Sequence, residues 1–68
     1  MKTKEAIRQV LQGQTYDLME IILGIMLLAK AGKYTSDTVS ITDLIKRNLR
    51  EMVKSGEVIK EEDRYRLK

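Results

Sequence analysis

The stretch VSITDLIKRNLREMVKSGEVIK, residues 39–60, decides the fold of this 68-residue chain. On a helical wheel of about 100° per residue, its apolar and basic side chains fall on nearly opposite arcs. The apolar arc holds Ile41, Leu44, Ile45, Leu49, Met52 and Val53, and the basic arc holds Lys46, Arg47, Arg50 and Lys54. The pattern predicts an amphipathic helix over residues 41–55. Ser40 is its expected N-cap, and Gly56 is expected to leave it at a positive φ.

Beyond Gly56 the sequence predicts a β-hairpin with strands at residues 57–60 and 64–67. The turn between them is Glu61-Glu62-Asp63. In the second strand Tyr65 and Leu67 alternate with basic residues, so one face of the hairpin is apolar and the other is cationic. We expect the following side chains of the helix and hairpin to be buried: Leu44, Ile45, Leu49, Met52, Val58, Tyr65 and Leu67.

Two further helices are predicted upstream. The first spans residues 3–12, with Thr3 as its N-cap and an apolar stripe of Ile7, Val10 and Leu11. A short extended connection at residues 14–16 follows, long enough for one or two strand pairs. The second helix spans residues 17–31.

The ends of the second helix carry recognisable signals. Asp17 and Glu20 form a capping-box pattern at its start, and Gly32 stands where a C′ glycine is expected. Residues 33–39 are expected to form a polar turn region. Together these features predict one mainly α-helical domain with a C-terminal β-hairpin.

The second helix is apolar almost all round, which is typical of a buried central helix. A chain this short has little material to cover every apolar side chain. One face, with Leu23 and Leu27, is therefore open to a second interpretation, in which it contacts another copy of the chain or a protein partner.

Composition limits the possible functions. The chain has a net charge of +3 and contains neither cysteine nor histidine, so disulfides, zinc fingers, thiolate nucleophiles and histidine bases are excluded. We expect that the protein is not an enzyme and that it binds no metal, cofactor or small-molecule substrate. The N-terminus lacks the apolar segment of a signal peptide, and the most apolar stretch, residues 18–29, is too short for a membrane span. A cytoplasmic protein is the expectation.

The chain resembles the winged-helix family in three features. These are the order of its elements, the pattern Leu49-x-x-Met52-x-x-x-Gly56-x-Val58 where the third helix ends and the hairpin begins, and the final Tyr65-x-Leu67. The resemblance is close over about 30 residues and loose over the rest. It implies three helices and a two-stranded wing, with the third helix reading DNA. By position, it implies DNA contacts from Ser40, Thr42, Lys46, Arg47, Arg50, Lys54, Arg64 and Arg66.

Double-stranded DNA binding is thus the expected function, as in a small transcriptional regulator or a nucleoid- or phage-type protein. Some winged helices bind proteins instead, as inhibitors or assembly subunits. The acidic turn Glu61-Glu62-Asp63 and the apolar second helix favour that alternative, because phosphate would repel carboxylates at the wing tip. If DNA is bound, the tip is expected to point away from it.

Overall fold

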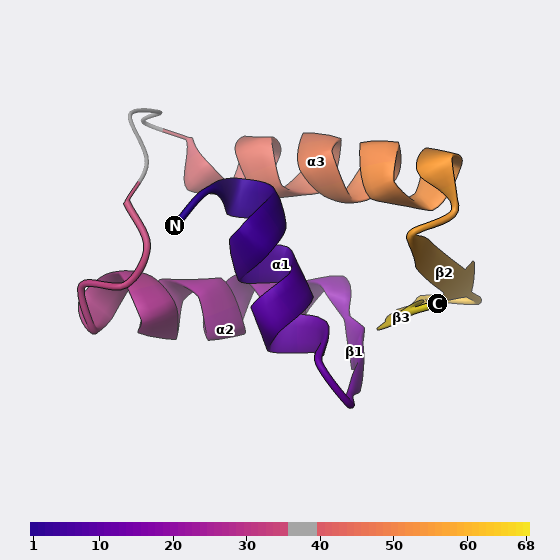
Figure 1. The fold of residues 1–68 in the computed structure, drawn as a ribbon, viewed down its shortest axis with the longest axis horizontal. Coiled ribbons are helices and arrows are strands. Elements are labelled where there is room, and N and C mark those ends of the chain that lie inside the picture. The colour runs from indigo at the N-terminus through magenta and orange to yellow at the C-terminus, as the bar shows by residue number, and fades with distance from the viewer. Residues whose placement is uncertain (36–39) are drawn as a thin grey trace.

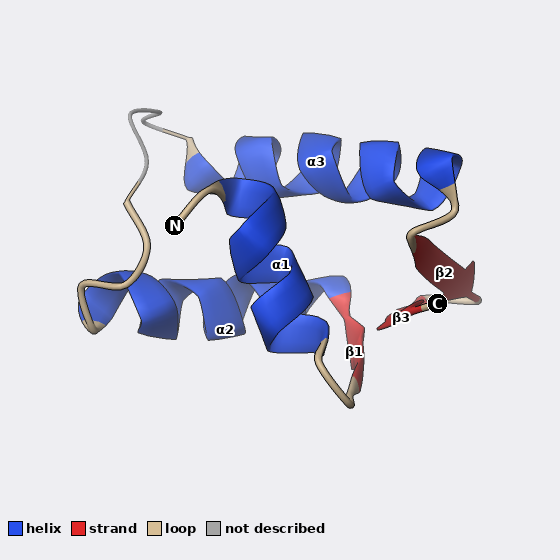
Figure 2. Ribbon diagram, in the orientation of Figure 1, coloured by secondary structure: helices blue, strands red, loops and turns tan. Residues whose placement is uncertain are grey.

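The computed structural model describes residues 1–35 and 40–68. In chain order the elements are α1 (Thr3–Leu11), β1 (Thr15–Asp17), α2 (Leu18–Lys30), α3 (Ile41–Ser55), β2 (Val58–Glu61) and β3 (Arg64–Leu67). The helices α2 and α3 run along the long axis on two sides of the core, α1 crosses in front of α2, and the strands lie at one end (Figures 1 and 2). A mainly helical chain with C-terminal strands was predicted, and this is what the structure has.

The predicted two-stranded wing is joined by a third strand. The sheet is antiparallel in the order β1-β3-β2, with Tyr16 opposite Tyr65 in one ladder and Lys60 opposite Tyr65 in the other. The short connection after α1 is therefore a real strand, and β3 is the central one. This arrangement ties the start of α2 to the hairpin.

The predicted caps of α2 are confirmed. The Asp17 carboxylate accepts a hydrogen bond of 2.8 Å from the Glu20 amide, and the Glu20 carboxylate accepts one of 3.0 Å from the Asp17 amide. At the other end Gly32 has a φ of 77°, and the Lys33 amide donates to the Leu28 carbonyl, as in a Schellman motif. Gly56 leaves α3 at a φ of 88°, as expected.

Two other cap predictions need correction. Thr3 is the first residue of α1, not its N-cap, because Lys2 holds the cap position. Ser40 does hold the N-cap position of α3, but its hydroxyl donates to the Asp43 carboxylate at 2.9 Å and makes no bond to a backbone amide. Both hydroxyls bond to other side chains instead, that of Thr3 to Tyr34 and that of Ser40 to Asp43.

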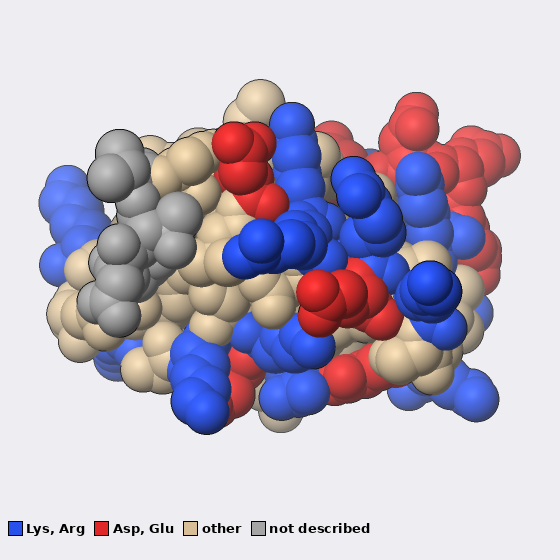
Figure 3. Space-filling model, turned by 90° about the horizontal axis from the view of Figure 1, so that it is seen from above, with Lys and Arg blue, Asp and Glu red and all other residues tan. Residues whose placement is uncertain are grey.

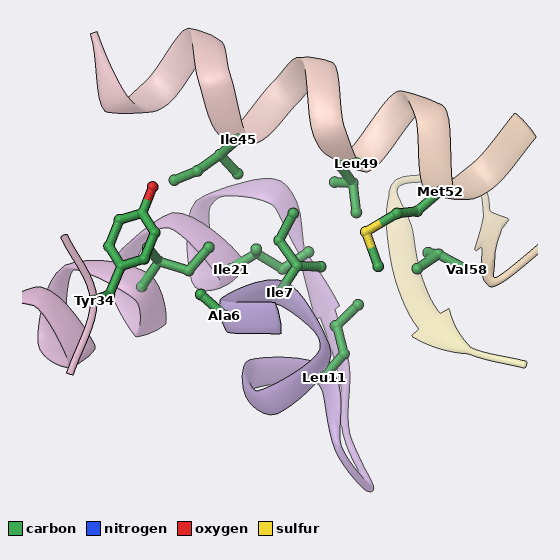
Figure 4. Close-up of a cluster of buried hydrophobic side chains, with 10 residues drawn as sticks. Ala6, Ile7, Leu11, Ile21, Tyr34, Ile45, Leu49, Met52 and Val58 are labelled. Carbon is green, nitrogen blue, oxygen red and sulfur yellow. The ribbon is translucent and has the colours of Figure 1, made fainter. Parts of the chain in front are cut away.

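The core lies between the three helices and the sheet, and Figure 4 shows most of its side chains pointing inward. Its buried residues are Ala6, Ile7, Leu11, Ile21, Ile25, Tyr34, Ile45, Leu49, Met52 and Val58. Four of the seven predicted core residues are in this set. Leu44, Tyr65 and Leu67 are only half-buried, and Tyr65 and Leu67 line hollows in the surface.

Tyr34 is the unexpected core member. It was assigned to a polar turn region, of which residues 36–39 lie outside the described chain. Instead its ring is buried, and its hydroxyl shares a hydrogen bond of 2.8 Å with the Thr3 hydroxyl of α1. The chain after α2 thus folds back to close the core beside Ile45 (Figure 4).

Candidate nucleic-acid interface

The outer face of α3 is basic. Ile45, Leu49 and Met52 are buried on its inner face, so the residues on the opposite arc of the helix point into solvent. The exposed basic residues are Lys46, Arg47, Arg50 and Lys54. Figure 3 looks down on this side of the molecule and shows basic side chains gathered over it, with acidic ones among them. We call these four residues the α3 basic stripe.

The stripe differs from four other basic residues, Lys4, Arg8, Arg64 and Arg66, which are held in ion pairs. Lys4 pairs with Glu51 at 3.0 Å, and Arg8 pairs with Glu57, which attaches α1 to the end of α3 and the following turn. Within residues 1–35 and 40–68, no ion pair involves a residue of the stripe. These charges are therefore available to an anionic partner.

Two predicted contact residues lie beside the stripe at the start of α3. Ser40 and Thr42 are both exposed. Asp43, which accepts the hydrogen bond from Ser40, is also exposed and lies on the outward side of the helix. The N-terminal turn of α3 is thus less cationic than its middle.

The strand arginines are placed apart from the stripe. Arg64 donates to the Thr15 carbonyl at 2.8 Å and lies 3.5 Å from the Glu20 carboxylate, while Arg66 pairs with Glu61 at 3.0 Å. Because side chains alternate along β3, both arginines point away from the face on which Tyr65 meets α3. The structure brings the four α3 residues together but does not add Arg64 and Arg66 to them.

The basic residue of the hairpin that lies near the α3 basic stripe is Lys60. Lys60 lies opposite Tyr65 in the β2–β3 ladder, and its ammonium sits 5.7 Å from the centre of the Tyr65 ring. A hollow of about 380 Å³ separates this hairpin from α3, lined by Leu18, Lys46, Leu49, Arg50, Val53, Lys60 and Tyr65. Strict alternation along the first hairpin strand could have revealed Lys60, since it shares a face with Val58.

The acidic turn lies closer to the stripe than expected. Asp63 lines a second hollow, of about 460 Å³, together with Thr42 and Lys46. Glu62 forms the turn with a φ of 57°, and Glu61 is engaged with Arg66. At least one carboxylate of the tip therefore borders the basic surface.

Two carboxylates around α3 have perturbed acidity. The hydrogen bond from Lys4 and the charge of Lys4 lower the pKa of Glu51, with a further contribution from Arg47. The hydrogen bond from Arg8 lowers the pKa of Glu57. The hydrogen bond to Glu57 in turn raises the pKa of Arg8. All of these groups are exposed, so the pairs hold their charges at neutral pH and add little to stability.

The outer face of α2 is apolar. Met19, Leu23, Met26 and Leu27 are 63%, 52%, 54% and 68% exposed, although each is a large hydrophobic residue. They lie at spacings of four, three and one, which places them on one side of the helix. We call them the α2 apolar face. Leu23 and Leu27, singled out from the sequence, both belong to it.

Comparisons with protein-family models, with curated proteins and with solved structures gave no match for this chain. Across residues 1–35 and 40–68, none of the helices has the length and apolar character to cross a membrane. The chain presents two distinct outward faces, the basic one of α3 and the apolar one of α2.

Proposed function

We propose that this chain is a binding protein rather than an enzyme, and that it binds double-stranded DNA by placing α3 in the major groove. The observation that supports this most is the α3 basic stripe. Its four cations are exposed, they take part in none of the ion pairs in the described part of the chain, and they project from a helix whose opposite face is buried.

The chemistry of the stripe fits a duplex. An α-helix fits the major groove, where an arginine can bond to the O6 and N7 atoms of one guanine. The lysines at either end of the stripe suit phosphate, which they would neutralise with release of counterions. Because the buried face of α3 holds the helix in place, Arg47 and Arg50 can enter the groove without any unfolding of the domain.

The architecture gives further support. Three helices followed by a hairpin agree with the winged-helix resemblance, in which the third helix is the reader. We assign the contacts to α3 itself, and we leave Arg64 and Arg66 as secondary candidates because their side chains have partners within the chain. Asp63 should oppose phosphate at the edge of the stripe, so Asp63→Asn should strengthen binding slightly.

The test is duplex binding by fluorescence anisotropy at two salt concentrations. Arg47→Ala combined with Arg50→Ala should weaken binding at least tenfold through lost base contacts, whereas loss of Lys46 or Lys54 should reduce the salt dependence by about one unit for each phosphate contact. The matched control is Lys2→Ala with Lys33→Ala, which removes the same charge elsewhere and should change binding little. If the α3 double variant folds and binds as the parent does, α3 is not the reader.

A second function rests on the α2 apolar face, and it is protein binding. We propose a second copy of the chain as the partner. In an antiparallel pair about a two-fold axis, Leu23 of one copy lies against Leu27 of the other. The same register places Glu20 of one copy near Lys30 of the other. The face is thus complementary to itself in both apolar surface and charge.

Sedimentation equilibrium at high micromolar concentration tests this pairing. The parent should sediment as a dimer, and Leu23→Gln with Leu27→Gln should sediment as a monomer with unchanged helix content. Lys30→Glu should weaken the dimer, since it would face Glu20 of the second copy, whereas Lys33→Glu should not. A monomeric parent would rule out self-association and leave the apolar face to a different protein.

A further inference from the structure

The hollow between α3 and the hairpin gathers positive charge from two elements. Lys46 and Arg50 reach it from α3, and Lys60 reaches it from β2. No carboxylate is among the described residues that line it. Three like charges around one hollow repel each other, and an anion placed among them would relieve that repulsion. The hollow therefore favours an anionic occupant.

The rest of the lining is apolar. Leu18 from the start of α2, Val53 from α3 and the half-buried ring of Tyr65 form its walls. An inorganic anion would leave this surface unused, and a neutral apolar molecule would leave the cations unpaired. The volume of about 380 Å³ lies within the range of small-molecule pockets. Charge and surface together describe an organic anion with an apolar body.

The neighbouring hollow determines in which orientation such a molecule would bind. It shares Leu18, Lys46, Lys60 and Tyr65 with the first and extends over the apolar side chains of Met19 and Ile22. It also contains the carboxylates of Asp17 and Asp63, which would repel an anionic group. The anionic end therefore belongs among the three cations, and the apolar body points toward α2.

We propose that the hollow beside Tyr65 binds a small organic anion with an apolar body, and that this ligand competes with DNA. The competition rests on the function proposed above, because Lys46 and Arg50 belong both to the hollow and to the α3 basic stripe. An anion in the hollow occupies the space beside two of the four cations of the stripe, Lys46 and Arg50. The lining, with three cations among apolar side chains, suits a bound ligand.

Binding is tested with three probes in a titration followed by backbone amide chemical shifts. Naphthoate has both the charge and the apolar body, naphthamide has the same shape without the charge, and inorganic phosphate has charge alone. Naphthoate should shift the amides of Lys46, Lys60 and Tyr65 and should bind at least tenfold more tightly than the other two. No saturable shift with naphthoate, or equal binding of naphthamide or phosphate, would overturn the site.

Variants separate the site from general surface charge. Lys60→Met keeps the apolar stem but removes one charge, and it should weaken naphthoate binding about tenfold, as loss of one charge-assisted contact does. Lys33→Met removes one charge elsewhere and should leave the affinity unchanged. Because Lys60 is exposed on the hairpin, neither change should disturb folding, which the far-ultraviolet circular dichroism of each variant checks.

Competition is tested in the anisotropy assay. Naphthoate should release duplex DNA from the parent, and at the same concentration it should release little from Lys60→Met. Naphthoate bound with no loss of DNA would overturn the competition. If the parent binds no DNA, the DNA-binding function fails, and the amide titration still decides the site by itself.

Discussion

The helices α2 and α3 pack against the same core but present opposite kinds of surface to solvent. In α3 the buried residues are Ile45, Leu49 and Met52, and the outer arc is basic. In α2 the fully buried residues are Ile21 and Ile25, and the outer side is the α2 apolar face. Two helices of one small domain therefore offer two different partner chemistries, charge on one and apolar surface on the other.

The difference shows how much core a short chain can supply. A helix needs only one stripe of apolar side chains to fill its share of the interior. The sequence of α3 has one such stripe and no more, whereas the sequence of α2 has apolar residues on both sides. Since contiguous exposed apolar patches often mark interaction sites, we attribute the surplus in α2 to a partner.

The largest expected effect comes from comparing the inner face of α3 with the outer face of α2. Leu49 is 2% exposed, and Leu49→Ala should cost about 2–5 kcal/mol of unfolding free energy, enough to unfold much of a domain this small. Leu23 is 52% exposed, and Leu23→Ala should cost far less in the monomer. Urea denaturation at low protein concentration measures both.

These two leucines also test the assignment of the faces. Equal losses for Leu49→Ala and Leu23→Ala, at a concentration where the chain is monomeric, would mean that the outer face of α2 is buried in the isolated domain. If instead the cost of Leu23→Ala grows with protein concentration, self-association through α2 is supported, because the dimer adds to apparent stability by mass action.

A smaller effect is expected where α2 meets α1. A Cβ atom at Gly24 would lie 2.8 Å from a methyl carbon of Val10, closer than packed atoms allow. Gly24→Ala should therefore destabilise the fold by about 1–2 kcal/mol, the cost of overpacking less the better helix propensity of alanine. The loss should disappear when Val10→Ala is already present. A double-mutant cycle by thermal denaturation measures this coupling, and a cycle without coupling would contradict the close approach of the two helices.

Local sequence signals predicted the elements well. The capping box of α2, its C′ glycine and the positive φ of Gly56 depend on residues within one turn of each other, so they can be recognised without tertiary structure. The basic stripe of α3 was predictable for the same reason, since helical periodicity places it opposite the core. Its role in DNA binding stays a prediction.

The features that could not be predicted from the sequence depend on contacts between residues far apart in the chain. Tyr34 follows a glycine and a lysine and looks like part of a polar turn, and only the fold brings it to Thr3. Arg64 and Arg66 look like an extension of the basic stripe, but in the sheet Arg64 bonds to the Thr15 carbonyl of β1 and Arg66 pairs with Glu61 of β2. Pairing with Tyr65 places Lys60 beside α3 instead.

The segment between α2 and α3 supplies a prediction of intermediate size. Tyr34→Phe keeps the buried ring but removes the hydrogen bond with Thr3, and it should cost about 0.5–1.5 kcal/mol. Thr3→Val should cost a similar amount, and the double variant should cost little more than either one. Urea denaturation of the three variants measures this, and additive losses would show that the two hydroxyls do not interact.

The smallest effect concerns the one carboxylate of α3 that is paired with α1. Because Lys4 lowers the pKa of Glu51 in the folded chain, the pair stabilises the fold above the pKa that Glu51 has when unfolded, about 4.3. That contribution is lost as the pH falls through the lower folded pKa. Glu51→Gln should therefore flatten part of the acid-side decline in stability, measured by urea denaturation between neutral and strongly acidic pH. Lys4→Met should flatten the same part, and the double variant should flatten no more.

The change should be small, since both side chains are about half exposed, and it should shrink further in high salt. An acid-side curve that Glu51→Gln leaves unchanged would show that the pair adds nothing, and α1 would then be held to α3 and the following turn by the apolar face of α3 and the Arg8–Glu57 pair.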